Sequence, residues 1–195
     1  MTSVSALENI HTKGLFGDYE NKNETDLLKI SESKNLLIVQ IVQYENSSIS
    51  IDDVDIDNLK LKNEPLNVIS NNDTRILWSG PKNWFLVSTK KNLLKNILQV
   101  FKDTDFAVTD LSHSRAIIEL EGQNVKEVLK KGCPYNFNLL DKNNSINSTY
   151  NGIAFTVDMI DDNPLKIRLF SLRSFGESLY YSISDSSLEF GYKAI

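Results

Sequence analysis

Apolar and polar positions follow strand-like patterns in the middle of the chain. Residues 36–44, LLIVQIVQY, are rich in Leu, Ile and Val and predict a buried strand. The runs RILWS (75–79) and WFLVS (84–88) flank the turn-rich spacer GPKN (80–83), and together they predict a β-hairpin. Alternation along this hairpin would place four side chains on one face, namely Ile76, Trp78, Trp84 and Leu86.

Helical spacing predicts three helices elsewhere. In residues 89–103 the apolar positions Leu93, Leu94, Ile97, Leu98 and Phe101 recur at intervals of three and four, and Thr89 is the predicted N-cap. Residues 124–131 predict a short helix that ends at Gly132, a natural C′ residue, before Pro134. A third helix follows the S-x-x-E capping box of Ser174 and Glu177. Its core-facing residues would be Leu179, Tyr180 and Ile183.

Four further strands complete the pattern. They are predicted at residues 107–111, 116–121, 150–160 and 165–170, and the turn DDNP joins the last two. Pairs of strands that are each followed by a helix predict an α+β fold, with helices packed on antiparallel sheet.

The remaining segments are polar. Residues 45–72 and 139–148 read as loops, with room for a short strand or helix near 59–66 in the first. Residues 1–32 are weakly patterned, and we expect an extended N-terminal arm that a partner would order. Residues 33–195 would then form a single domain.

Composition narrows the class of protein. The 195 residues are 41% hydrophobic and 24% charged, as in folded soluble proteins, and the formal net charge is −5. Dispersed basic residues and a negative net charge argue against a nucleic-acid partner. No stretch approaches the roughly 20 apolar residues that span a bilayer. The single cysteine, Cys133, rules out an internal disulfide, and the first residues lack a secretory-signal pattern, so we expect a cytoplasmic location.

The segment DLSHSR, residues 110–115, concentrates polar chemistry. One interpretation combines Asp110, His113 and Cys133 as orienter, base and thiol nucleophile. The other is a turn between two strands, in which Asp110 and Ser112 bond to nearby backbone amides and Arg115 pairs with an acid or packs on the sheet. We favour the turn, because nothing in the spacing specifies a catalytic geometry.

Nucleotide and metal motifs are missing from the sequence. It contains neither G-x-G-x-x-G nor G-x-x-x-x-G-K-[ST]. His11, His113 and Cys133 are its only imidazoles and thiol, and the acidic run 51–57 lacks the glycine and terminal Glu of a calcium loop. We therefore predict no catalytic, cofactor-binding or metal-binding residues in this chain.

Aromatic residues offer a different chemistry. Trp78 and Trp84 would form either a stacking platform for a flat ligand such as a pterin or, as we favour, core or interface anchors. The aromatic-rich C-terminus suits docking against a partner; its residues are Tyr180, Tyr181, Phe190 and Tyr192.

Four stretches resemble the gamma subunit of heterotetrameric sarcosine oxidase. They are LWSGPKNWFLVS (77–88), VTDLSHSRAIIELEG (108–122), VLKKGCPYNF (128–137) and LRSFGESLYYSISDSSLEFG (172–191). Their layout is also similar to the folate-binding domain of aminomethyltransferases such as the glycine-cleavage T-protein. Asp73 lies nearest to the folate-contacting acid of that family, but its surroundings do not match.

The resemblance implies a function shared among subunits. Such a complex oxidatively demethylates sarcosine to glycine, passes the one-carbon unit to tetrahydrofolate and forms hydrogen peroxide. It uses FAD, covalent FMN, NAD and zinc, all held by alpha, beta and delta subunits. The gamma subunit would be a non-catalytic partner. The alternative is a stand-alone folate-binding protein or a folate-dependent aminomethyltransferase.

Overall fold

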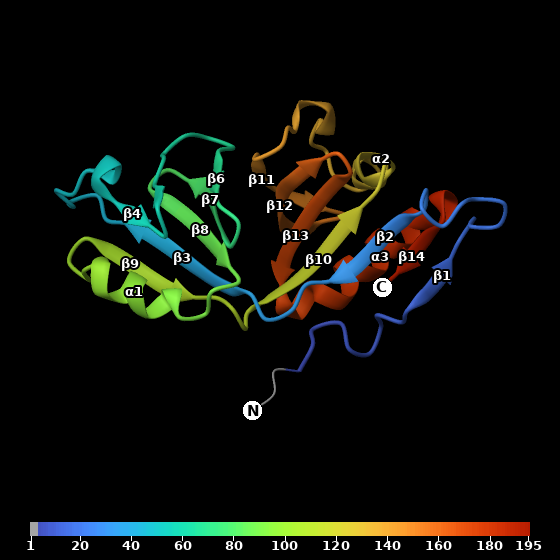
Figure 1. Ribbon diagram of the computed structural model, residues 1–195, viewed down its shortest axis with the longest axis horizontal. Helices are drawn as coiled ribbons and strands as arrows, with labels where there is room; N and C mark the ends of the chain where they lie inside the picture. The colour runs from blue at the N-terminus through green and yellow to red at the C-terminus, as the bar shows by residue number, and fades with distance from the viewer. Residues whose placement is uncertain (1–3) are drawn as a thin grey trace. The chain divides into compact units, whose positions relative to one another are not determined.

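The computed structural model describes residues 4–195, which form two compact units (Figure 1). Unit 1 contains the chain up to Lys34 together with Ser114–Lys142 and Ile146–Ile195, and unit 2 contains Asn35–His113 and Asn143–Ser145. Each unit has its own sheet and its own buried apolar cluster. The division therefore differs from the predicted arm followed by one domain, although the α+β class is confirmed.

Unit 1 is built on a seven-stranded sheet with the order β1-β14-β2-β10-β13-β12-β11. Its strands are β1 (Gly14–Phe16), β2 (Leu28–Glu32), β10 (Arg115–Glu121), β11 (Ser145–Tyr150), β12 (Ile153–Asp162), β13 (Leu165–Leu172) and β14 (Tyr192–Ala194). The strand β10 pairs antiparallel with both β2 and β13, whereas β2 and β14 run parallel. The sheet is thus antiparallel around β10, as predicted, with one parallel pair near its edge.

The N-terminal residues are part of this sheet, which corrects the predicted arm over residues 1–32. The strand β2 lies between β14 and β10, and Leu28 and Ile30 are at most 1% exposed. Before it, β1 pairs with β14, and the backbone amide of Asp18 donates to the carbonyl of Leu188 (2.7 Å). Residues 14–32 therefore pair with other segments of this chain. The first three residues of the predicted arm lie outside the described residues.

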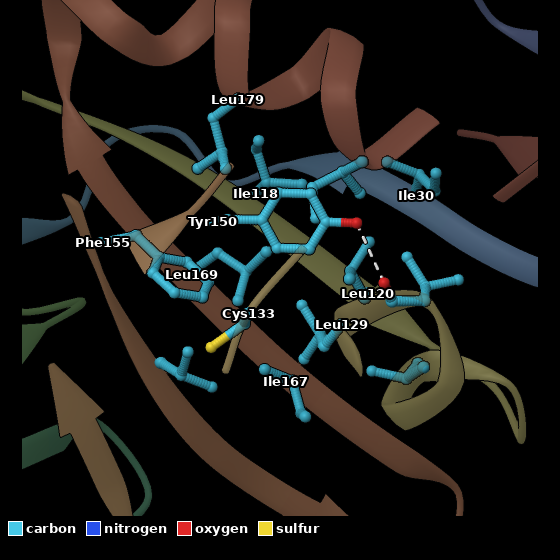
Figure 2. Packing of buried hydrophobic residues seen from close by; sticks show 14 of the residues in the cluster. Ile30, Ile118, Leu120, Leu129, Cys133, Tyr150, Phe155, Ile167, Leu169 and Leu179 are labelled. Atoms are coloured by element: carbon cyan, nitrogen blue, oxygen red, sulfur yellow. Dashed lines mark hydrogen bonds between the residues drawn. The ribbon is translucent and has the colours of Figure 1, made fainter. Parts of the chain in front are cut away.

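Helices cover one face of the seven-stranded sheet. The elements are α2 (Val125–Lys130) and α3 (Gly176–Ser187), with the 3₁₀ turns η2 (Phe137–Leu139), η3 (Arg173–Phe175) and η4 (Leu188–Phe190). Leu129 of α2 and Leu179 of α3 share one buried cluster with the sheet residues Ile30, Ile118 and Leu169 (Figure 2). The predicted core residues Leu179, Tyr180 and Ile183 are confirmed, since each is at most 5% exposed.

Two helix-end predictions for unit 1 are wrong in detail. The box of Ser174 and Glu177 does not cap α3, because the turn η3 occupies Ser174 and the helix begins after Phe175, which makes no side-chain cap. Gly132 follows α2 as expected, but a left-handed backbone is not what requires glycine there. A Cβ atom at residue 132 would lie 2.6 Å from the ring of Tyr150, so close packing excludes a side chain.

Unit 2 is built on a five-stranded sheet with the order β6-β7-β8-β3-β9. Its strands are β3 (Leu37–Gln43), β6 (Val68–Ser70), β7 (Thr74–Gly80), β8 (Asn83–Ser88) and β9 (Phe106–Asp110), with a separate pair of β4 (Asp55–Ile56) and β5 (Leu59–Lys60). The predicted strand at 36–44 and the hairpin at 75–88 are confirmed. Residues 45–72 contain β4, β5, β6 and the turn η1 (Ile51–Asp53) where mostly loop was expected.

The helix α1 (Leu93–Val100) packs on the sheet of unit 2 through Leu93 and Ile97. This helix is confirmed, but its start is not at Thr89. Asn92 occupies the N-cap position without a side-chain cap, and the hydroxyl of Thr89 donates instead to the carboxylate of Asp73 (3.2 Å). The face shared by Ile76, Trp84 and Leu86 carries the core that α1 covers.

We predict that Ile30→Ala lowers the free energy of unfolding by about 2–5 kcal/mol, because it opens a cavity where β2 meets the core of unit 1. Urea denaturation followed by far-ultraviolet circular dichroism measures this change. Lys13→Ala, at an exposed side chain of the N-terminal segment, is the control and should change stability by less than about 0.5 kcal/mol. Equal stability of Ile30→Ala and the unmodified chain would show that the N-terminal segment is an arm after all.

Candidate functional site

The polar segment 110–115 is a turn whose side chains are used structurally. The carboxylate of Asp110 accepts hydrogen bonds from the backbone amide and the hydroxyl of Ser112, at 2.9 and 2.6 Å. The Ser112 hydroxyl oxygen in turn accepts from the backbone amide of Ile38 (3.0 Å). This confirms the predicted role of Asp110 and Ser112 in bonding to nearby amides.

The same segment is not a hairpin turn, however. The preceding strand β9 pairs with β3 in unit 2, and the following strand β10 pairs with β2 and β13 in unit 1. The polar turn therefore contains one of the points at which the chain passes from unit 2 to unit 1. Burial lowers the pKa of Arg115, whose guanidinium donates to the carbonyl and hydroxyl oxygens of Ser114.

The three residues of the thiol interpretation, Asp110, His113 and Cys133, belong to different units. Cys133 belongs to the core of unit 1, is 5% exposed and donates to the hydroxyl of Ser148 (3.3 Å). Figure 2 shows its sulfur among apolar side chains that include Leu129 and Ile167. Asp110 and His113 are exposed residues of unit 2. Cys133 is thus placed as an apolar filler and not as a nucleophile.

Trp78 and Trp84 share one face of the β7–β8 hairpin and lie opposite each other, as predicted. Trp84 is 1% exposed, and its indole donates to the carbonyl of Lys62 (2.7 Å). Trp78 is half-buried and donates to the side-chain oxygen of Asn63 (3.0 Å). A two-ring stacking platform is excluded because Trp84 is a core residue, so only Trp78 retains an accessible surface.

The aromatic C-terminus divides between core and surface. Tyr180 and Tyr192 are buried, Phe190 is half-buried, and Tyr181 is 72% exposed. Burial raises the pKa of Tyr180 to about 12, so this phenol stays protonated. His11 fixes its position, because Nε2 donates to the carbonyl of Ile195 and Nδ1 then accepts from the Tyr180 hydroxyl, both at 2.9 Å. His11 is therefore a structural residue.

Asp73 is engaged in a structural network of unit 2. Its carboxylate accepts from Thr89 and pairs with Lys90 (3.3 Å), whose ammonium also contacts Asp57 (2.9 Å). A hydrogen bond from buried Thr74 is the main cause that lowers the pKa of Asp57. These bonds tie the β4–β5 pair to the sheet, and they occupy both carboxylate oxygens of Asp73, whose side chain is 47% exposed.

The most perturbed carboxylate of unit 1 is Glu119 on β10. Burial raises its pKa, but the charge of Arg168 and hydrogen bonds from Ser33, Arg168 and Lys166 outweigh burial and hold the pKa at about 2. The guanidinium of Arg168 contacts Glu119 through Nε (2.8 Å) and Nη2 (2.6 Å), and Lys166 lies 3.0 Å from the other oxygen. These ion pairs join β10 to β13 and stabilise the pairing of the two strands.

A cavity of about 470 Å³ lies in unit 1 beside the start of α2. Its lining residues are Thr25, Asp26, Gly122, Gln123, Lys126, Leu140, Asp141, Lys142, Met159, Asp162, Asn163, Pro164 and Leu165. The ammonium of Lys126 donates to the carbonyl of Leu140 (3.0 Å). The lining contains charged side chains of both signs and several apolar side chains, and it contains no thiol, imidazole or serine hydroxyl.

Residues 4–195 offer neither a metal cluster nor a helix suited to a bilayer. No group of three or more His, Cys, Asp or Glu side chains in this range lies close enough to hold a metal ion. Every helix within the same range is too short or too polar to cross a membrane.

We predict that Glu119→Gln lowers the free energy of unfolding by about 3 kcal/mol at neutral pH, because the lowered pKa measures how strongly the fold favours the carboxylate. That contribution is complete above the unfolded pKa of 4.5 and is lost as pH falls toward the folded pKa of about 2. Urea denaturation at pH 7, 4.5, 3 and 2 should show the gap closing. Glu127→Gln, at an exposed ion pair with Lys130, is the control, and a gap independent of pH would contradict the assignment.

We also predict that Cys133 reacts with a thiol reagent at least about tenfold more slowly in the folded chain than in urea, because its sulfur is buried. Absorbance at the released chromophore measures both rates. Fast labelling of the folded chain would restore the nucleophile interpretation.

Comparison with known proteins identifies the family. The family model described as sarcosine oxidase, gamma subunit family matches residues 57–189. No match was found among curated proteins. Among solved structures, the chain is similar to heterotetrameric sarcosine oxidase from Corynebacterium sp. U-96 in complex with pyrrole 2-carboxylate. The TM-score is 0.82 at 20% identity, covering 96% of this chain and 95% of that one.

A second similar structure is the glycine cleavage system aminomethyltransferase T from Bartonella henselae. The TM-score is 0.59 at 13% identity, and the match covers 84% of this chain but only 48% of that one. Both structures support the α+β fold predicted from the sequence. Since the family model spans more than half of the residues, the chain belongs to the sarcosine oxidase, gamma subunit family.

Proposed function

We propose that this chain is a non-catalytic gamma subunit of a heterotetrameric sarcosine oxidase. The complex would oxidatively demethylate sarcosine to glycine, transfer the one-carbon unit to tetrahydrofolate and form hydrogen peroxide. FAD, FMN, NAD and zinc would be held by alpha, beta and delta subunits in the cytoplasm. The observation that carries the proposal is the family match over residues 57–189.

The chemistry of the chain's own residues supports a scaffold role. Cys133 is a buried filler, the Asp110 and Ser112 side chains close a turn, and Asp73 is paired with Lys90. The sequence singled these groups out as catalytic candidates or, for Asp73, as the nearest match to the folate-contacting acid. Each of them is either hydrogen-bonded within the fold or buried, and His113 is the exception because it is exposed. A subunit of this kind contributes surface and shape, while the neighbouring subunits supply the reacting groups.

The competing function is stand-alone folate binding or aminomethyl transfer. The fold similarity to the aminomethyltransferase favours it, although the match covers less than half of that enzyme. Against it, the carboxylate of Asp73 is committed to Lys90 and Thr89. Calorimetric titration of the soluble chain with tetrahydrofolate separates the two functions, and binding in the micromolar range would favour the folate protein.

We predict that the chain expressed alone is largely insoluble and becomes soluble when co-expressed with alpha, beta and delta subunits. An obligate contact of this kind buries about 2,000 Å² or more, which is exposed when the partners are missing. Co-purification followed by native mass measurement should give one copy of this chain in a heterotetramer. A stable monomer that fails to bind the other subunits would overturn the proposal.

A further inference from the structure

The outward side of α3 carries a stripe of side chains that the core of unit 1 does not use. Glu177, Tyr181 and Asp185 of α3 follow one another at spacings of four, and Leu188, the first residue of η4, comes three positions later, so all four lie on one side of this helical segment. The buried residues of α3 lie on the opposite side and include Leu179, Tyr180 and Ile183. We call the four residues Glu177, Tyr181, Asp185 and Leu188 the α3 stripe.

The α3 stripe exposes an aromatic ring and an aliphatic side chain. Tyr181 is 72% exposed, the highest fraction among the exposed large apolar residues of residues 4–195, and Leu188 is 41% exposed. Aromatic residues of this kind supply much of the binding energy when they are buried at an interface. The other face of the same helix is fixed in the core, so the ring is presented from a rigid element.

The charges of the α3 stripe indicate what covers it. Glu177 and Asp185 flank Tyr181 one turn away on either side, and neither forms an ion pair within the described part of the chain. The helix α3 itself contains no Lys or Arg. By contrast, nearby Glu189 is already paired with Lys131 (2.7 Å). The stripe is therefore an aromatic ring between two carboxylates that lack a cation among residues 4–195.

An arginine fits this arrangement better than any other side chain. Its guanidinium stacks on an aromatic face and at the same time donates paired hydrogen bonds to a carboxylate. We propose that the α3 stripe docks on an arginine-bearing, partly apolar surface of another subunit of the heterotetramer. This inference rests on the proposed function, because it assumes that such a subunit is present.

Dilution of the purified heterotetramer tests the inference, with mass photometry following the fraction of complexes that retain this chain. Tyr181→Ala should raise the apparent dissociation constant by about thirtyfold, as expected for an aromatic anchor, and Tyr181→Phe by no more than about threefold. Glu177→Lys combined with Asp185→Lys should weaken the complex and reverse its dependence on salt between about 50 and 300 mM.

Matched controls come from unit 2. Leu98→Ala removes an apolar side chain that is 55% exposed on α1, and Asp52→Lys combined with Asp53→Lys makes the same change of charge in an exposed acidic turn. Both should leave the dissociation constant within about threefold. An equal loss in the controls, or full retention by Tyr181→Ala, overturns the inference.

The two proposals fail in different ways. If the unmodified chain does not assemble with the other subunits, the proposed function is wrong. If the unmodified chain assembles and the α3 stripe variants assemble equally well, the proposed function stands and the docking surface is elsewhere. Circular dichroism of each variant checks that the fold is intact, since all substituted side chains are exposed.

Discussion

The pairing of β2 with both of its neighbours is the contact on which unit 1 depends. In the order β1-β14-β2-β10-β13-β12-β11, this one strand joins the β1–β14 pair to the rest of the sheet. Ile30 lies opposite Leu120 on one side and beside Ala194 on the other. Residues near both ends of the chain therefore fold together with its middle. Because such pairings close long loops before they gain stability, unit 1 is expected to form late in folding.

Strong periodicity explains which elements were predictable. The hairpin of β7 and β8 and the helices α1, α2 and α3 each repeat a local pattern over six or more residues. By contrast, β2 is five residues and β14 only three, and both become strands through pairing with distant segments. Their local sequences carry too little propensity to predict that outcome. The same limit explains why residues 45–72 were read as loop although β6 belongs to a sheet.

The candidate site shows a similar division between local and long-range information. Asp110 and Ser112 form the turn that their residue types favour, and this chemistry is local. That β9 and β10 belong to different units depends on which partner each strand finds, and the alternation within them cannot reveal it. Trp84 and Trp78 occupy one face, yet only Trp84 is covered. Its cover includes the segment at Lys62, whose carbonyl accepts the indole hydrogen, and that segment had no readable pattern.

The two sides of α3 couple assembly to folding. Its inner side contributes Leu179 and Ile183 to the core, so the helix is in place only when unit 1 is folded. A partner that binds the outer side therefore binds the folded state alone, and at about a hundred times its dissociation constant it stabilises that state by about 2.7 kcal/mol. A gain of this size is a large share of the net stability of an ordinary domain. The inner side of α3 thus packs in the core of unit 1, and its outer side is covered by another chain.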